Sequence, residues 1–243
     1  MTDDPIVVVG AARTPIGGFQ GVLTGASAPH LGASAIEAAL ERSGVAVDTI
    51  DEVLMGCVLA AGQGQAPARQ AALGAGLPLG VGCTTVNKMC GSGMKAVMLA
   101  HDQIQAGSST IVVAGGQESM TNAPYLLPRA RSGLRLGHAD VIDHMFLDGL
   151  EDAYEPGRLM GSFAEDCADH YSFSREDQDD YAIESLTRAT EAIESGAFAS
   201  QITRVTVSTR KGDVTVDTDE QPQTANIEKI PQLKPAFRKG GTV

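Results

Sequence analysis

The sequence is poor in cysteine and has no long apolar run. Its four cysteines form no C-x-x-C pair and are too sparse for a secreted disulfide scaffold. We therefore expect four reduced thiols and no structural metal site. No apolar stretch is long enough to cross a bilayer, and the acidic start at residues 1–4 is unlike a targeting signal. These absences predict a cytoplasmic protein that does not enter a membrane.

An excess of basic residues is also missing. The chain carries 18 lysines and arginines against 30 aspartates and glutamates, a formal net charge of −12. That balance argues against a nucleic-acid-binding surface. The glycine-rich segment 10–21 contains neither a G-x-G-x-x-G pattern nor a Walker-type lysine, so we assign it no nucleotide role. What remains is an ordinary globular composition, 43% hydrophobic and 20% charged.

Short apolar strands alternate with helices in the first half of the chain. This alternation predicts an α/β fold: a mostly parallel sheet covered by helices on both faces, an α-β-α layered core. Strands are expected at 6–9, 52–58, 84–86 and 110–114, with those at 6–9 and 84–86 buried. Helices are expected at 29–43, at 67–75 and from the turn at 90–93 to about 106.

The composition changes near residue 120. Residues 121–150 show little periodicity, which is typical of a functional or interfacial excursion. Helices are expected at 162–171 and 175–195, the second capped by Ser174, and a hairpin at 202–208 and 214–217. We therefore predict a core α/β domain at 1–120 and a mixed α+β insertion at 121–243.

One segment, 84–98, combines a strand, a sharp turn and a helix around Cys90. Apolar residues at Met94, Val97, Met98 and Ile104 are expected to form the buried helix face. Helix N-terminal N–H groups and the dipole stabilise anions, so a thiol here gains thiolate character. Glycines 91 and 93 allow a tight turn and the close approach of an acyl group. Cys90 is thus a candidate nucleophile, although many cysteines are simply small buried side chains.

The residues around Cys90, N-K-M-C-G-S-G at 87–93, resemble the nucleophile segment of the thiolases, the coenzyme A-dependent acyltransferases. Further segments resemble the same family in the same order along the chain: 11–17, 115–120, 122–125, 160–165 and 233–237. This resemblance implies a thiolase-type fold and an acyl-CoA acyltransferase. Cys90 would carry the acyl group in Claisen condensation of acetyl-CoA or in thiolysis of a 3-oxoacyl-CoA.

The resemblance also implies site residues and partners. Residues 121–243 would be the loop domain that covers coenzyme A and contributes oligomer contacts, in a homodimer or homotetramer. Coenzyme A and acyl-CoA would be substrates, with no permanently bound cofactor. Arg210 and Lys211 are candidates to bind the phosphates of coenzyme A, and Met160 and Phe237 to contact the rest of that molecule. The alternatives are an ordinary solvated hairpin tip and plain core positions.

Two motifs of the family have no counterpart in these 243 residues. The Gly-His-Pro and Cys-x-Gly-Gly-Gly segments, which supply the acid/base groups, are absent. Each of the five histidines lies in a different context and is expected to be a surface or helix residue. We therefore expect the front part of a thiolase without its C-terminal domain, inactive by itself.

Other functions stay open at this stage. One is a non-catalytic thiolase-like subunit that binds acyl-CoA or a partner chain; the intact Cys90 segment argues against it. Another is a ketosynthase-like condensing enzyme, which the 115–120 segment and the long insertion disfavour. Leu159 and Gln223 stand where short-chain acetoacetyl-CoA enzymes commonly carry a histidine and an arginine. These two departures leave longer acyl groups open.

Overall fold

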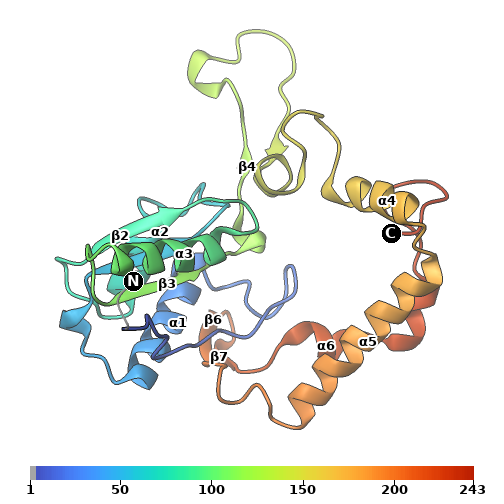
Figure 1. The fold of residues 1–243 in the computed structure, drawn as a ribbon. Coiled ribbons are helices and arrows are strands. Elements are labelled where there is room, and N and C mark those ends of the chain that lie inside the picture. Colours follow the sequence, from blue (N-terminus) through green and yellow to red (C-terminus); the bar gives the residue numbers. More distant parts are fainter. Residues whose placement is uncertain (1–3) are drawn as a thin grey trace. The chain divides into compact units, whose positions relative to one another are not determined.

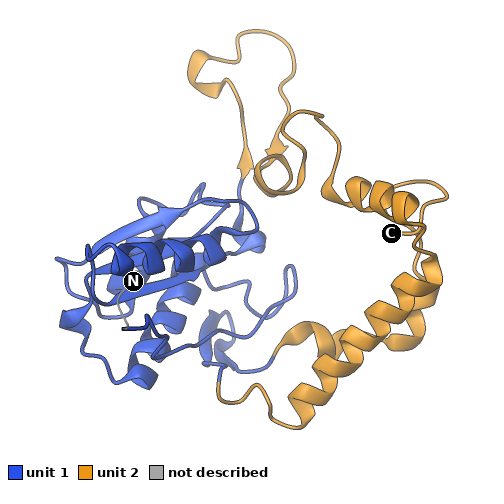
Figure 2. Cartoon of the chain, in the orientation of Figure 1, with its two compact units in different colours: residues 1–124, 201–218 blue, residues 125–200, 219–243 orange. Residues whose placement is uncertain are grey.

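The computed structural model describes residues 4–243, so the acidic start at residues 1–3 lies outside the described residues. The chain forms two compact units (Figure 2). Unit 1 contains the described residues up to Pro124 together with Gln201–Thr218, and unit 2 contains Tyr125–Ser200 and Asp219–Val243. Each unit is described by itself.

Unit 1 is built on a three-stranded parallel sheet in the order β2-β1-β3 (Figure 1). Its strands are β1 (Glu52–Gly56), β2 (Gly82–Val86) and β3 (Val112–Gly116), and its helices are α1 (Ala28–Ser43), α2 (Pro67–Gly74) and α3 (Ser92–Gln105). The central strand β1 is buried on both faces, as expected for a parallel sheet. β2 lies at an edge and is only partly buried, so the prediction of a buried strand at 84–86 is wrong in that respect.

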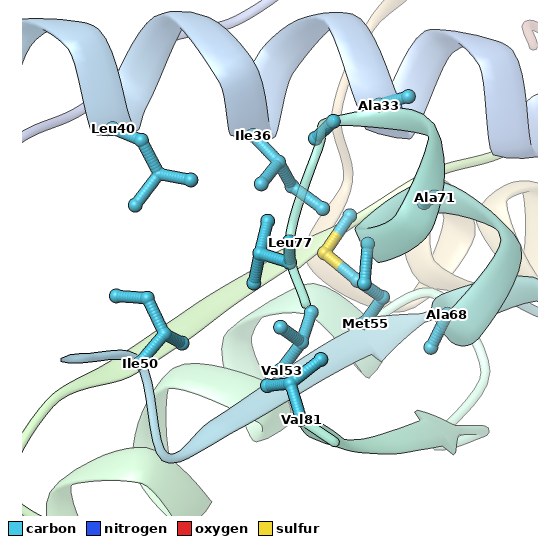
Figure 3. Packing of buried hydrophobic residues seen from close by; sticks show 12 residues of the cluster. Ala33, Ile36, Leu40, Ile50, Val53, Met55, Ala68, Ala71, Leu77 and Val81 are labelled. Carbon is cyan, nitrogen blue, oxygen red and sulfur yellow. The ribbon is translucent and has the colours of Figure 1, made fainter. Parts of the chain in front are cut away.

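The side chains of β1 point alternately to two hydrophobic clusters. Val53 and Met55 pack with α1 and α2 in the first cluster (Figure 3). Leu54 points the other way and packs with Ala96 and Ala100 of α3. Because a strand presents successive side chains to opposite faces, this pattern makes unit 1 the predicted α-β-α sandwich.

The buried face of α3 differs from the predicted one. Ala96 and Ala100 are buried against the sheet, whereas Met94 is 74% exposed and Val97 and Met98 are each about half exposed. Alanine lets a helix approach the sheet closely, so the small residues take the inner face. The larger apolar side chains form an exposed face on the other side, and the predicted face was wrong.

Residues 6–9 form no strand. The side chains of Val7, Val8 and Val9 are 65%, 82% and 58% exposed, so the predicted buried strand is wrong. Strand formation needs a neighbouring strand to complete the backbone hydrogen bonds, and no strand of residues 4–243 pairs with this segment. Apolar β-branched character alone is insufficient.

The hairpin of β6 (Val205–Thr209) and β7 (Gly212–Val216) belongs to unit 1. Val205 and Val207 pack with Leu23 and Ala26 in a third apolar cluster. The guanidinium of Arg42 donates to the carbonyl oxygens of residues 201 and 202 at 2.9 Å. This hairpin, grouped with 121–243 from the sequence, thus packs with the α/β core.

Unit 2 begins with a long excursion and continues with helices. The excursion contains the two-stranded pair β4 (Tyr125–Leu126) and β5 (Ile142–Asp143) and a π-helix at Phe146–Leu150. The helices that follow are α4 (Met160–Tyr171), α5 (Arg175–Glu194) and the short α6 (Glu220–Thr224). Short 3-10 helices occur at Val47–Thr49 and Met120–Asn122 in unit 1 and at Ala130–Ser132 and Ile227–Gln232 in unit 2.

Ser174 caps α5, as predicted. Its hydroxyl accepts the N–H of Asp177, whose carboxylate in turn accepts the N–H of Ser174, which completes a capping box. Within residues 4–243, no helix has both the length and the apolar character needed to span a membrane.

Candidate functional site

The candidate site lies at the carboxyl edge of the parallel sheet in unit 1. β1 is followed by Cys57, β2 by the turn that contains Cys90, and β3 by Gln117 and Glu118. In open α/β sheets the segments that follow the strands meet at this edge, where ligands commonly bind. The sheet therefore gathers two thiols and a carboxylate from three separate stretches of sequence.

The turn before α3 presents Cys90 to solvent. Cys90 is exposed and lies two residues before the first residue of α3, Ser92. Met89, directly before it, adopts a left-handed conformation with φ 49°. The side-chain oxygen of Asn87 accepts the Met89 N–H at 3.0 Å. The turn thus carries the predicted nucleophile at a helix start.

Ser92 closes the other side of this turn. Its hydroxyl oxygen accepts the N–H of Lys88 at 2.9 Å and donates to the carbonyl oxygen of Met89 at 2.5 Å. Its own backbone N–H donates to the same carbonyl at 2.9 Å. The Ser92 side chain is only 5% exposed. These three bonds link the residues on both sides of Cys90.

Glycines let the helix start sit directly on the sheet. A Cβ on Gly56, the last residue of β1, would lie 2.6 Å from the nitrogen of Gly93. A Cβ on Gly116, the last residue of β3, would lie 3.3 Å from the Cα of Gly93. The backbone at the start of α3 is therefore in contact with the ends of two strands. These contacts fix the position of the helix start, and of the Cys90 turn before it, relative to the sheet.

Glu118 joins the ends of β1 and β3. Its carboxylate accepts the N–H of Val58 at 2.8 Å and of Leu59 at 3.0 Å. The thiol of Cys57 lies 3.6 Å from the same carboxylate. Burial, together with the negative charge of Glu118, raises the pKa of Cys57 to about 12. Cys57 is therefore held as a neutral thiol and is a poor nucleophile.

The remaining thiols differ from Cys90 in their positions. Cys83 is partly buried in β2, and this burial raises its pKa. Cys167 is exposed but lies within α4, away from a helix start. Of the four cysteines, all of which the structure describes, Cys90 alone combines exposure with a helix start.

Arg210 and Lys211 form the exposed two-residue tip of the β6–β7 hairpin. The hydroxyl of Thr209 donates to the carbonyl of Gly212 at 2.7 Å and accepts the N–H of Lys211 at 3.2 Å. Gly212 has φ 114°, a conformation that side chains rarely adopt. A hydrogen-bonded turn therefore displays both cationic side chains in solvent, where they can bind an anionic ligand.

Met160 and Phe237 both lie at the start of α4 in unit 2. Met160 is the first residue of that helix. The ring of Phe237 lies against the next residue, Gly161, so closely that a Cβ on Gly161 would overlap the ring. Both side chains are partly exposed, at 45% and 41%. The structure thus brings this predicted pair together from positions 77 residues apart in the sequence.

A buried carboxylate supports the segment that carries Phe237. Glu165 is 1% exposed and accepts the N–H groups of Thr242 at 2.9 Å and Val243 at 3.0 Å. Arg238 donates to Asp169 at 2.8 Å and lies 3.4 Å from Glu165. The N–H of Thr242, then that of Val243, and then Arg238 lower the pKa of Glu165 against the opposing effect of burial.

His144 differs from the other histidines in being buried, in a short helical stretch, which is one of the two placements expected from the sequence. His144 is 5% exposed, and its Nδ1 lies 2.6 Å from a carboxylate oxygen of Asp148. The other four histidines are exposed, as expected. Among the described residues, no group of three or more histidines, cysteines and carboxylates is placed to hold a metal ion.

Sequence reasoning proposed Cys90 as the nucleophile but gave no separate role to the residues that hold its turn or join the ends of β1 and β3. Asn87 was included only as part of a motif, and Ser92 and Glu118 had no assigned role. A signal for Asn87 was available, because asparagine often hydrogen-bonds the backbone two residues further on. No local signal exists for Glu118, whose partners lie about 60 residues away.

Comparison with known proteins assigns the family. The model of the thiolase N-terminal domain matches residues 6–243. The chain is 50% identical over 240 residues to an acetyl-CoA acetyltransferase of Pseudomonas aeruginosa, covering 98% of this chain and 61% of the relative. It is 51% identical over 245 residues to an acetyl-CoA acetyltransferase of Cupriavidus necator, covering 100% of this chain and 62% of the relative.

The chain belongs to the thiolase family, through its N-terminal domain. A third relative, acetyl-CoA acetyltransferase 2 of Arabidopsis thaliana, is 51% identical over 241 residues, covering 98% of this chain and 60% of the relative. The chain thus spans about three fifths of the length of these relatives. The family assignment confirms the thiolase-type α/β fold expected from the sequence.

Proposed function

We propose that this chain is the nucleophile-bearing part of an acyl-CoA acyltransferase of the thiolase type. The observation that carries the proposal is the exposed Cys90 at the start of α3, at the carboxyl edge of a parallel sheet. The names of the relatives, acetyl-CoA acetyltransferases, support acetyl-CoA as acyl donor.

In the proposed reaction, the thiolate of Cys90 attacks the thioester carbonyl carbon of an acyl-CoA. The carbon–sulfur bond to coenzyme A breaks, coenzyme A leaves as its thiolate and takes up a proton, and the acyl group remains on Cys90. The backbone N–H of Cys90 is proposed to donate to the oxyanion that forms in between. A second acyl-CoA, deprotonated at its α-carbon, then takes the acyl group and releases the Cys90 thiolate; thiolysis is the reverse.

The acyl-enzyme step is tested by the intact mass of the purified chain before and after exposure to acetyl-CoA. A gain of one acetyl group on the Cys90 peptide, absent in Cys90→Ser, is expected if the thiol is activated within this chain. An acetyl gain that survives Cys90→Ser would contradict the proposed role. Longer acyl-CoA donors in the same assay show whether Leu159 and Gln223 favour longer chains.

The acid/base groups of the full reaction are proposed to lie in the part of the relatives that this chain does not span. The sequence has neither a Gly-His-Pro nor a Cys-x-Gly-Gly-Gly segment. We therefore propose that residues 1–243 do not turn over by themselves. Steady cleavage of a 3-oxoacyl-CoA by the isolated chain, abolished in Cys90→Ser, would contradict this.

For coenzyme A, we propose phosphate contacts from Arg210 and Lys211 and further contacts from Met160 and Phe237. The two cations lie on an exposed hairpin tip, and the two apolar residues both lie at the start of α4. Arg210→Ala and Lys211→Ala should each weaken coenzyme A binding and reduce its salt dependence. Arg204→Ala is the matched control, because Arg204 is an exposed cation at the base of the same hairpin. Equal losses in all three variants would contradict a specific contact.

The domain division at residue 120, with a loop domain at 121–243, stays a proposal. So does assembly as a homodimer or homotetramer, which the exposed apolar side chains of the excursion support: Leu136 is 99% and Tyr125 67% exposed. Sedimentation analysis tests the assembly. A cytoplasmic location is proposed because all four cysteines are free thiols, as a reducing compartment would keep them.

A further inference from the structure

The turn that presents Cys90 contains a left-handed residue that is not glycine. Met89 has φ 49° and lies directly before the nucleophile. For an L-residue this conformation brings the Cβ too close to the following carbonyl oxygen, so it is disfavoured unless neighbouring groups hold it. The direction in which Cys90 leaves the turn therefore depends on what holds Met89.

Two side chains hold both polar backbone groups of Met89. Asn87 accepts its N–H at 3.0 Å, and the hydroxyl of Ser92 donates to its carbonyl oxygen at 2.5 Å. Ser92 also accepts the Lys88 N–H at 2.9 Å, so one hydroxyl bonds both Met89 and the residue before it. None of these three side-chain bonds belongs to the backbone hydrogen-bond pattern of a helix or strand.

The end of β1 packs directly against Ser92. A Cβ on Gly56 would lie 2.7 Å from the Cβ of Ser92, which shows how closely the two residues approach. Ser92 is thus packed against the end of β1, and its hydroxyl donates to the carbonyl oxygen of Met89. The geometry makes Ser92 a link between the sheet and the nucleophile turn.

We propose that Asn87 and Ser92 are positioning residues for Cys90: together they hold Met89 left-handed, and this directs the thiol to solvent at the start of α3. The proposal rests on the proposed function, in which Cys90 carries the acyl group. Neither residue is proposed to touch the substrate or to transfer a proton.

The test uses substitutions at Met89 as well as at the two positioning residues. Ser92→Ala removes the hydroxyl, and Met89→Gly removes the penalty for φ near 50° because glycine adopts this conformation freely. Met89→Ala is the matched control, since it also removes the thioether but keeps the Cβ that causes the penalty. For Asn87, which is exposed, Asn87→Ala removes the acceptor and Asn87→Asp retains it.

The readout is the rate at which iodoacetamide alkylates Cys90, divided by the rate at Cys167 in the same molecule. Cys167 is exposed in unit 2 and serves as the reference thiol, while buried Cys57 reports global unfolding. From the population cost of a left-handed non-glycine residue, Ser92→Ala should lower the ratio by about five- to thirty-fold. Asn87→Ala should lower it in the same direction, Asn87→Asp should preserve it, and Cys57 should stay unreactive.

Rescue distinguishes positioning from a general structural role. In the Met89→Gly background, Ser92→Ala should lower the ratio by less than about two-fold, because glycine needs no clamp. In the Met89→Ala background the full loss should remain. An unchanged ratio in both Ser92→Ala and Asn87→Ala would overturn the proposal, as would a loss that Met89→Gly does not reduce. If Ser92→Ala exposes Cys57, the comparison of Asn87→Ala with Asn87→Asp decides the matter.

These outcomes are independent of acyl transfer, since no acyl-CoA is present. The acetyl mass gain is measured separately on the same variants. An acetyl gain that survives Cys90→Ser would overturn the proposed function and leave the alkylation result intact. An alkylation ratio unaffected by the clamp would overturn the positioning role and leave the proposed function intact.

Discussion

A Cβ placed on Gly56 would lie 2.5 Å from the backbone carbonyl carbon of Ser92. The last residue of the central strand and the first residue of the nucleophile helix are therefore in backbone contact. Gly56→Ala should lower the free energy of unfolding by about 1–3 kcal/mol, because backbone on both sides must move apart. Urea denaturation measures the loss.

Gly82→Ala is the control for this change. Gly82 is also a strand glycine, but the nearest atom to its added Cβ would be 3.7 Å away, an ordinary contact. The free energy of unfolding of Gly82→Ala should differ from that of the unsubstituted chain by less than about 0.5 kcal/mol. Equal effects at the two glycines would show that the close approach of Gly56 to Ser92 is unimportant.

Cys57 should resist alkylation at pH 8 under conditions that modify Cys90 and Cys167. Burial and the carboxylate of Glu118 raise the pKa of Cys57 to about 12, so the nucleophilic thiolate is scarce. Because this pKa exceeds the value of 9.0 for a free thiol, Cys57 contributes stability that is full below pH 9 and is lost as the pH rises toward 12. Peptide mass mapping of iodoacetamide-treated protein checks the order of reaction.

Glu118→Gln should make Cys57 easier to alkylate above pH 9, since one of the groups that raise its pKa loses its charge. Glu37→Gln, at an exposed position on α1, should have no such effect. Rapid modification of Cys57 in the unsubstituted chain at pH 8 would argue against its burial beside Glu118.

Glu165 should make unit 2 sensitive to acid. The N–H groups of Thr242 and Val243, with Arg238, hold its pKa below the ordinary 4.5. The stability it contributes is therefore present above pH 4.5 and is lost as the pH falls through its lower value in the folded protein. Hydrogen exchange of the amides of residues 242 and 243 should accelerate in this range.

Glu165→Gln should accelerate amide hydrogen exchange at residues 242 and 243 at neutral pH. It should also make the exchange rate of these amides less dependent on pH in the acid range. Glu184→Gln provides the control, because Glu184 pairs with Arg188 on the exposed side of α5. If exchange at residues 242 and 243 is the same in both variants at every pH, Glu165 does not hold this segment.

Ser174→Ala should destabilise α5 by about 1 kcal/mol, because the N–H of Asp177 loses its side-chain acceptor. Ser195→Ala, at the other end of the same helix, should have little effect, since its hydroxyl makes only a long 3.4 Å bond to the carbonyl of Ala192. Helix content followed during thermal unfolding measures both. A larger loss in Ser195→Ala would contradict the capping argument.

Local signals explain what could be predicted from the sequence. The end of α1 at Ser43 and the Ser174 cap of α5 depend on neighbouring residues, and both were predicted correctly. The candidate nucleophile was found because glycines, a helix start and a family motif coincide around Cys90. Short-range features of this kind are visible in a single sequence.

Long-range relationships account for the rest. Residues 6–9 have strand-like side chains, but pairing is decided by distant segments. The inner face of α3 was missed because the small side chains of Ala96 and Ala100 decide how closely it packs. The left-handed Met89 had no signal at all, since methionine has no preference for that conformation; it follows from contacts made by Asn87 and Ser92.

The return of the hairpin 201–218 to unit 1 limits the modularity of this chain. The polypeptide passes from one unit to the other three times, after residues 124, 200 and 218. A fragment that stopped at residue 124 would lack Val205, Val207 and Val216 and would leave Leu23 and Ala26 without their apolar partners. Neither unit can be released by a single cut, so an exchange of unit 2 at the gene level must keep residues 201–218 with the α/β core.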